Sequence, residues 1–333
     1  MNSMGEKGSA LAEVRARTAL RGAGLDPSVP LIRASSVTNE VWLTPTYAVR
    51  VNRTNNSRLA REATLAAALP PEVGYPRVVA HGSGRGEDWL VSERVPGDPL
   101  AHRWPDLSRA ERRLAVRQLA ARLAALHSTI PPADLPPLAQ VPQLLETGSS
   151  DPTRPLVDAL HEAASLEFVD RLLMHETIDV VRRSASVLVP FDGPTLIHGD
   201  LTFENVLWHE GEVTALLDVE WSRRGPVDLD LDIILRCCAF PQLHVAEAYE
   251  ARTTSDDYAE VPWWLADDYP ALFDVPGLLD RLRLYALAYD VRALLAFPPK
   301  VPTGQLPKLH PYHRLAQVVR RQSYLDTLQH GWR

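Results

Sequence analysis

The sequence predicts an α+β fold of two unequal lobes, a small antiparallel sheet that carries one helix and a larger, mainly helical part. Short β-branched or aromatic segments separated by turn residues occupy much of residues 28–97. From about residue 100 onward, apolar residues recur at helical spacing instead. A chain of 333 residues is long for one domain but short for two independent ones. We therefore expect an N-terminal helix at 1–27, a sheet lobe at 28–97 and a helical lobe at 98–333.

The expected sheet lobe alternates between strand and helix patterns. A weak apolar stripe predicts a helix over residues 10–20. The alanine-rich stretch 59–69, LAREATLAAAL, is typical of a helix and ends at a proline pair. Five short strands are predicted, at residues 30–33, 40–43, 47–51, 76–80 and 88–95. The lobe is therefore a five-stranded sheet with one helix after the third strand, and it ends at Gly97.

The expected helical lobe contains one hairpin. Apolar residues at helical spacing predict a helix over 109–128, and the stretch 156–188 carries similar patterns. The proline-rich segment 131–142 is typical of a stiff connector. Residues 206–217 predict a hairpin, because a His-Glu-Gly-Glu turn separates two β-rich runs. The chain after residue 228 is predicted to be helical, with breaks at prolines.

The composition excludes several classes of protein. The net charge is −7, so the surface lacks the basic field that nucleic acids and anionic membranes require. No stretch approaches about 18 apolar residues, and the charged N-terminus does not resemble a secretion signal. Cys237 and Cys238 are adjacent, and neighbouring cysteines do not readily reach disulfide geometry. We therefore expect a cytoplasmic protein that acts on a small molecule, with no nucleic-acid or membrane partner.

A segment near residue 200 places polar residues inside an apolar run. In IHGDLTFENVLW, apolar residues flank Asp200 and Asn205, and Asp218 follows the second hairpin strand in LLDVE. Asn205 and Asp218 are expected at one hairpin mouth, offset by about two residues along the strands. Their amide and carboxylate oxygens suit Mg²⁺ that arrives with a nucleotide. Asp200 is placed nearby to orient and deprotonate an attacking hydroxyl group.

These motifs resemble those of a known family. HGDLTFEN followed by LLDVE is similar to the HGD-x-x-x-x-N and downstream Asp motifs of the aminoglycoside phosphotransferase and choline kinase family, which is related to protein kinases. The resemblance implies a protein-kinase-like two-lobe fold, with nucleotide bound by the sheet lobe and hinge and the acceptor by the helical lobe. It implies that Asp200 is the catalytic base and that Asn205 and Asp218 hold Mg²⁺. Structural roles are expected for His198 and for Asp230, which would brace the catalytic loop.

The resemblance also identifies nucleotide-binding positions. Only three lysines occur in the chain, and Arg50 takes the place of the family's usual third-strand lysine, with Glu62 as its helix partner. A purely stabilising Arg50–Glu62 pair is the alternative. Glu220 is expected either to support the metal or to face the acceptor. The remaining expected contacts come from a phosphate-capping loop and from main-chain groups of the hinge, at Ser35, Ser36, Thr38, Asn39, Glu93 and Val95.

The sequence thus predicts an Mg²⁺-dependent phosphotransferase that uses ATP or GTP and a small molecule with an alcohol group as acceptor. Acidic residues near two tryptophans favour a cationic acceptor, and they are Asp256, Asp257, Glu260, Asp267 and Asp268. An aminoglycoside acceptor would make the protein an antibiotic-resistance kinase, whereas choline and homoserine are primary-metabolite alternatives. The missing lysine and the glycine-free loop motivate a second hypothesis, a catalytically weak kinase-like nucleotide-binding module.

Overall fold

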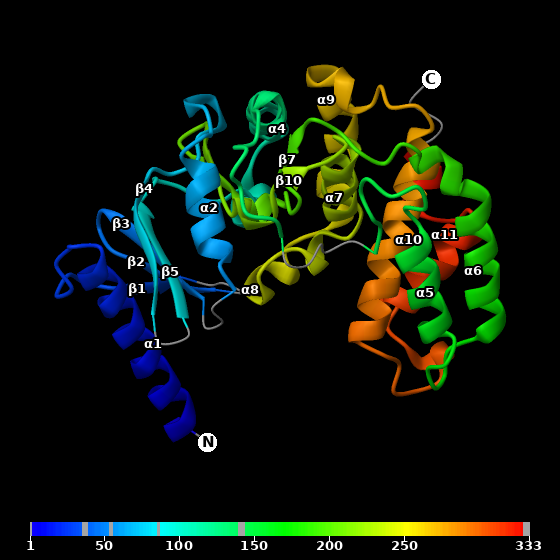
Figure 1. Ribbon diagram of the computed structural model, residues 1–333, viewed down its shortest axis with the longest axis horizontal. Coiled ribbons are helices and arrows are strands. Elements are labelled where there is room, and N and C mark those ends of the chain that lie inside the picture. Colours follow the sequence, from blue (N-terminus) through cyan, green and yellow to red (C-terminus); the bar gives the residue numbers. More distant parts are fainter. Residues whose placement is uncertain (1, 35–38, 53–55, 85–86, 139–143, 329–333) are drawn as a thin grey trace.

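The N-terminal part of the molecule is an antiparallel sheet (Figure 1). The computed structural model describes residues 2–34, 39–52, 56–84, 87–138 and 144–328. The strand order is β1-β2-β3-β5-β4, and all neighbouring strands are antiparallel. The strands are β1 (Ile32–Ala34), β2 (Glu40–Leu43), β3 (Tyr47–Asn52), β4 (Val78–Gly84) and β5 (Glu87–Glu93). The predicted five-stranded sheet is confirmed.

Two helices cover opposite faces of this sheet. Helix α1 (Asn2–Gly22) shares an apolar cluster with Val91, whereas α2 (Arg58–Ala66) shares another with Leu90. Successive residues of a strand point to opposite faces, so the two helices lie on opposite sides of β5 (Figure 1). Helix α2 follows the third strand as predicted, and α1 begins earlier than the expected residue 10.

The chain enters the helical lobe through a short strand. Gly97 has φ +130°, and a Cβ atom there would lie 3.0 Å from the carbonyl oxygen of Trp208. Strand β6 (Asp98–Pro99) therefore runs close beside β8 (Val206–His209), which in turn pairs with β9 (Glu212–Leu216). The predicted hairpin is confirmed, and the first residues after the hinge add a third strand to it.

The rest of the chain is mainly helical. Helix α4 (Arg109–Ser128) has the predicted bounds, because Ser108 and Glu111 form a capping box that fixes its start. Strands β7 (Leu196–Ile197) and β10 (Arg223–Arg224) form a two-stranded ribbon. The other helices are α3 (Leu100–Arg103), α5 (Arg154–Ala163), α6 (Arg171–Ser184), α7 (Asp228–Ala239), α8 (Glu247–Glu250), α9 (Val261–Asp268), α10 (Leu278–Ala296), α11 (Pro311–Val319) and α12 (Tyr324–Leu328).

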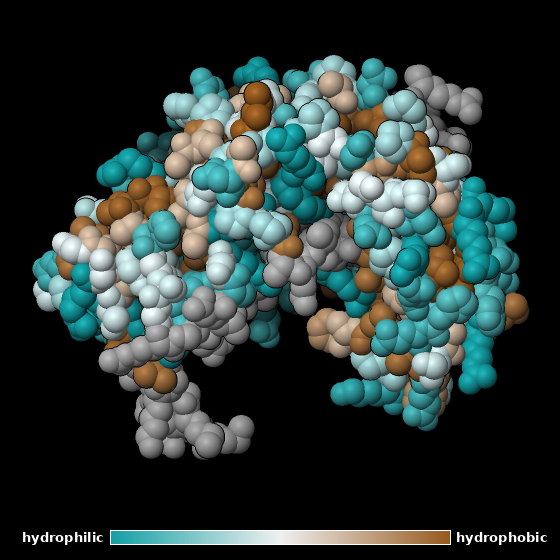
Figure 2. Space-filling view, viewed as in Figure 1, coloured by the Kyte–Doolittle hydropathy of each residue, from teal (hydrophilic) through white to brown (hydrophobic). Residues whose placement is uncertain are grey.

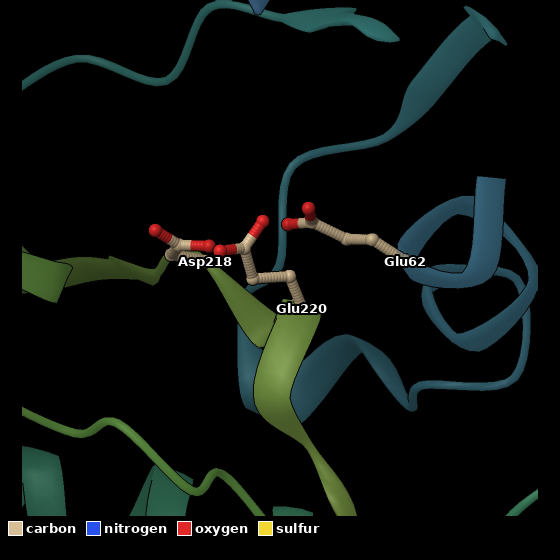
Figure 3. Close-up of side chains that lie close together, drawn as sticks. All are labelled: Glu62, Asp218 and Glu220. Carbon is tan, nitrogen blue, oxygen red and sulfur yellow. The ribbon is translucent and has the colours of Figure 1, made fainter. Parts of the chain in front are cut away.

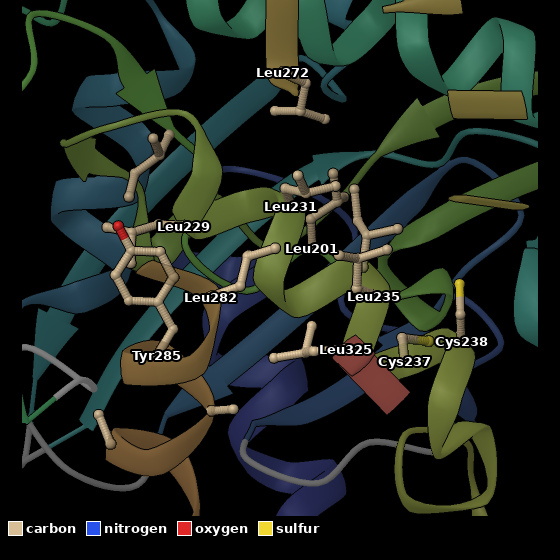
Figure 4. Packing of buried hydrophobic residues seen from close by; sticks show 14 of the residues in the cluster. Leu201, Leu229, Leu231, Leu235, Cys237, Cys238, Leu272, Leu282, Tyr285 and Leu325 are labelled. Carbon is tan, nitrogen blue, oxygen red and sulfur yellow. The ribbon is translucent and has the colours of Figure 1, made fainter. Parts of the chain in front are cut away.

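One large apolar core holds the helical lobe together. Leu231 and Leu235 of α7 gather with Leu282 of α10 in its interior (Figure 4). Leu65 and Val73 of the sheet lobe belong to the same core, so the two lobes are packed together. Figure 2 shows a broad indentation between the sheet lobe and the group of α5, α6, α10 and α11. None of the described helices is long and apolar enough to cross a membrane.

Candidate active site

Asp200 lies on a tight turn directly after β7. Gly199, the residue before it, has φ +82°, and a Cβ atom there would lie 2.6 Å from the carbonyl oxygen of Trp221. Only glycine fits both constraints. Burial raises the pKa of Asp200 to about 7, and the nearby charges of Asp218 and Glu220 act in the same direction. This carboxyl group is therefore poised to exchange a proton near neutral pH.

The buried carboxylate of Asp230 accepts hydrogen bonds from the turn that carries Asp200. The main-chain N–H groups of His198 and Gly199 donate to Asp230, at 2.7 and 2.8 Å. Nε2 of His127 lies 3.0 Å from Oδ2 of Asp230, and its Nδ1 lies 3.0 Å from the hydroxyl oxygen of Tyr269. Burial alone would raise the pKa of Asp230, but these hydrogen bonds and the two histidines hold it below its ordinary value. The pair of Asp230 and His127 thus fixes the backbone that presents Asp200.

The hairpin mouth brings Asn205 to the same turn. The Asn205 side-chain amide donates to the carbonyl oxygen of Asp200 at 2.8 Å, which leaves its own side-chain oxygen to accept a ligand. The Asn205 carbonyl oxygen accepts from the N–H of Leu217 at 2.8 Å, so Asp218 is the next residue beyond the mouth. Asp218 has φ +60°, an unusual value for a residue with a side chain. Asp200, Asn205 and Asp218 therefore meet around one short stretch of backbone.

Arg50 on β3 connects this mouth to the sheet lobe. Its Nη1 donates to Oε1 of Glu62 on α2 at 2.6 Å, and its Nη2 donates to Oδ1 of Asp218 at 2.8 Å. The Tyr75 hydroxyl also donates to Oε1 of Glu62, at 2.6 Å. Burial lowers the pKa of Arg50, but the carboxylates of Asp218 and Glu62 outweigh it and hold the pKa above the ordinary value. The guanidinium thus links a strand, a helix and the hairpin mouth.

Three carboxylates face one another at this place (Figure 3). Glu62, Asp218 and Glu220 each contribute an oxygen, and these atoms lie within 4.8 Å of one another. Glu62 and Glu220 are buried, and among the described residues Oε2 of each accepts no hydrogen bond. Arg50 and Arg58 approach Glu220 no closer than 3.7 Å. Unsatisfied hard oxygens of this kind are suited to a divalent cation.

The other expected nucleotide contacts divide into three groups. Ser35, Ser36 and Thr38 lie outside the described residues, and Asn39 is buried directly before β2. At the hinge, the N–H of Glu93 donates to the carbonyl oxygen of Arg77 at 2.9 Å. Within the described part of the chain, the main-chain groups of Val95 have no hydrogen-bond partner. Val95 rather than the N–H of Glu93 is therefore available to a ligand.

Two arginines at the site were missed from the sequence. Arg58 stacks over Trp221 at 4.2 Å from the ring centroid. Arg61 donates to the carbonyl oxygens of Pro136, Glu220 and Ser222. Because these acceptors are main-chain atoms, no pattern of residue types marks the contacts. The contact of the Tyr75 hydroxyl with Glu62 was also not predicted, because it joins two different elements and follows no local pattern.

The acidic residues expected to attract a cationic acceptor are engaged elsewhere. Asp257 pairs with Arg112 at 2.9 Å, and Asp268 pairs with Arg113. The same arginine approaches Asp267 to 4.0 Å, and Arg109 bonds Glu260 at 2.7 Å. These arginines lie on α4, against which α9 packs. Arginines of the same lobe thus lie beside these four carboxylates, and an attraction of the segment for a cationic acceptor stays a prediction.

Two aspartates of α7 have buried arginine partners. Asp228 begins α7, is buried and accepts from Arg281 at 2.6 Å. Asp232 is buried beside Arg236. The helix is covered on this side by α10, so both carboxylates need buried cationic partners.

Comparisons with known proteins identify the family of the chain. The model of the phosphotransferase enzyme family matches residues 32–264. The chain is 33% identical over 167 residues to the aminoglycoside 3'-phosphotransferase of Streptomyces fradiae and 30% identical over 168 residues to that of Streptomyces ribosidificus. Each alignment covers 49% of this chain, with 57% of the first relative and 59% of the second. The chain thus spans less than two thirds of the length of the curated relatives it matches.

Solved structures share the whole fold at low identity. The GDP complex of wild-type aminoglycoside 2'-phosphotransferase-IIIa gives a TM-score of 0.61 at 16% identity, over 93% of this chain and 98% of that one. ADP-bound aminoglycoside phosphotransferase APH(2'')-Ib gives 0.60 at 15% identity, over 89% and 96%. The predicted kinase-like two-lobe fold is therefore confirmed.

Proposed function

The chain belongs to the phosphotransferase enzyme family, and from this premise we propose that it transfers the γ-phosphoryl group of ATP or GTP to a hydroxyl group of a small molecule. The observation that carries the proposal is the convergence of Asp200, Asn205 and Asp218 around one turn, with Arg50 bridging to Glu62. We assign the nucleotide to residues 28–97 and the acceptor to residues 98–333. The use of a nucleotide is supported by related proteins that were solved with ADP, ATP or GDP.

In the proposed reaction, Asp200 positions the acceptor hydroxyl for in-line attack. The acceptor oxygen bonds to the γ-phosphorus as the bond from that phosphorus to the β–γ bridging oxygen breaks, and the nucleoside diphosphate leaves. Asp200 accepts the hydroxyl proton, and its pKa of about 7 matches that role near neutral pH. The bonds from His198 and Gly199 to Asp230 keep the carboxylate in place without a change of backbone.

Asn205 and Asp218 would hold the Mg²⁺, with Glu220 as a supporting carboxylate. When bound, the ion neutralises charge on the phosphates. Within the described residues, Oε2 of Glu220 and Oε2 of Glu62 accept no hydrogen bond, and a buried carboxylate oxygen without a partner is costly. A cation bound at this place would satisfy both oxygens. Arg50 would contact the phosphates through the N–H group that now binds Asp218, while its other N–H group remains on Glu62.

The acceptor is proposed to be an aminoglycoside or another polyhydroxylated small molecule. The support is the similarity to two aminoglycoside 3'-phosphotransferases and to structures solved with streptomycin and hygromycin B. The acidic residues of the 256–268 segment give no support, since most are paired with arginines of α4. Choline and homoserine therefore belong in the same acceptor panel, and a role in antibiotic resistance depends on which acceptor is used.

The test is a search for acceptor-dependent formation of ADP or GDP with Mg²⁺ over a panel of aminoglycosides, other antibiotics, choline and homoserine. Asp200→Asn is the matched control, because it preserves shape while removing the base. Transfer by the wild type and its loss in the variant are expected.

Nucleotide binding without transfer to any acceptor would contradict the proposal. That outcome would favour the second candidate, a catalytically weak nucleotide-binding module. Its specific motivation is that Arg50 stands in the lysine position and occupies Asp218 in the ligand-free molecule.

A further inference from the structure

Arg61 on α2 makes an unusual set of contacts for a buried charge. Its side chain is 4% exposed. Nε donates to the carbonyl oxygen of Pro136 at 2.7 Å, Nη1 to that of Glu220 at 3.2 Å and Nη2 to that of Ser222 at 2.5 Å. Burial lowers the pKa of this guanidinium, which contacts carbonyl dipoles through all three nitrogens. One side chain thus joins three segments that are far apart in the chain.

Two of the three acceptors belong to the loop that carries the metal-binding carboxylates. Glu220 and Ser222 flank Trp221 at the end of the single 3₁₀ turn that begins after Asp218. Asp218 itself has φ +60°, a conformation that costs a residue with a side chain about 1 kcal/mol or more. Such a conformation persists only when the surrounding structure holds it, and the two bonds from Arg61 hold the far end of this turn.

The side chains that contact this loop belong to α2, the helix that also carries Glu62. Arg58, one turn before Glu62, stacks on Trp221, and Arg61 directly precedes Glu62 in the chain. A displacement of α2 would therefore pull on the 218–222 loop as well as on Glu62. The third bond, to the carbonyl oxygen of Pro136, connects the segment after α4 to the same guanidinium. This segment is part of the proline-rich connector predicted from the sequence.

We propose that Arg61 is a positioning residue that locks α2, the 218–222 loop and the segment around Pro136 into one unit, so that the metal-binding carboxylates are assembled before the nucleotide arrives. Arg61 acts through the backbone of Glu220 and Ser222, since all three of its guanidinium nitrogens donate to main-chain carbonyl oxygens. This inference rests on the proposed function for its catalytic consequence. Its structural part concerns the ligand-free molecule and can be measured without turnover.

The chain offers a matched control in Arg122. Among the described residues, the hydrogen bonds of this arginine also go to main-chain carbonyl oxygens, those of Glu72 and Val213, and burial likewise lowers its pKa. These bonds join α4 to other segments and not to the 218–222 loop. Arg61→Met and Arg122→Met therefore delete the same chemistry at two places, and a general loss of stability should affect both.

The experiment compares the two variants with the wild type in two measurements. Hydrogen exchange of the ligand-free proteins follows the peptide that covers residues 216–224. The Mg²⁺ concentration that gives half-maximal transfer is measured per folded protein. For Arg61→Met we expect faster exchange in this peptide and an increase of about ten-fold or more in that Mg²⁺ concentration, the size typical for loss of a group that orients metal ligands. For Arg122→Met we expect both to stay at wild-type values.

Unchanged exchange in Arg61→Met, or equal changes in both variants, would overturn the proposal. Faster exchange with an unchanged Mg²⁺ requirement would also overturn it, because Arg61 would then stabilise the loop without positioning its carboxylates. If the wild type transfers no phosphoryl group, the proposed function fails separately, and the exchange measurement alone still decides whether Arg61 holds the loop.

Discussion

Glu220 provides a direct test of the electrostatics of the site. Its carboxylate is 1% exposed and lies beside Asp218 and Glu62, and the nearest nitrogens of Arg50 and Arg58 are each 3.7 Å away. Burial raises its pKa from 4.5 to about 7, and the charge of Asp218 acts in the same direction. The substitution Glu220→Gln keeps the shape of the side chain and removes the charge. The ligand-free protein should therefore become more stable in the pH range where Glu220 is ionised.

The size of the effect follows from the two pKa values. Between pH 4.5 and about 7 the folded state binds more protons at Glu220 than the unfolded state, so ionisation destabilises the fold as pH rises. The difference between 4.5 and about 7 corresponds to about 3.5 kcal/mol, at about 1.4 kcal/mol for each step of one in pKa. The glutamine variant should thus be about 3 kcal/mol more stable at pH 8. At pH 5 most of the ionisation penalty is absent, and the difference should shrink to about 1 kcal/mol or less.

Urea unfolding without Mg²⁺ or nucleotide, followed by tryptophan fluorescence at pH 5 and pH 8, measures this difference. Glu162→Gln on α5 is the control, because that side chain is exposed and should give no pH-dependent change. Equal free energies of unfolding for the wild type and Glu220→Gln at pH 8 would refute the reasoning. The same variant should bind Mg²⁺ less tightly, since the charge that destabilises the empty site favours the cation.

Further predictions concern the turn and the nucleotide side. Asp200→Asn should lower kcat by about 100-fold or more while the nucleotide Kd, measured by calorimetry, stays unchanged. Because Asp200 must be ionised to accept a proton, kcat/KM of the wild type should fall as pH decreases through about 7. In Glu220→Gln this fall should occur at lower pH, because the charge of Glu220 raises the pKa of Asp200. Arg50→Lys should cost about 1.5–3 kcal/mol in unfolding free energy, because one ammonium cannot replace both charged hydrogen bonds. Gly199→Ala should abolish turnover and destabilise the fold, as thermal unfolding would report.

The fold could be predicted from the sequence because the signals that determine its helices and strands are local. Strand propensities, the proline pair after α2 and the helical spacing of apolar residues in α4 each act within a few residues, and the elements formed where these patterns occur. The motif spacing also placed Asn205 and Asp218 at one hairpin mouth. The surroundings of the acidic 256–268 segment could not be predicted in this way. Its partners on α4 lie more than a hundred residues earlier in the chain, and helix packing alone brings them together.

The replacement of lysine by arginine has a consequence that only the structure makes visible. Arg50 uses separate nitrogens for Glu62 and Asp218, whereas a lysine would present a single ammonium to both. In the ligand-free molecule, Arg50 therefore holds Asp218. If Asp218 binds Mg²⁺ as proposed, the N–H group of Arg50 that is released from it would donate to a phosphate oxygen instead. The guanidinium can thus keep its contact with Glu62 throughout, so the arginine is compatible with transfer and explains how three carboxylates are tolerated in a buried site before the ligand binds.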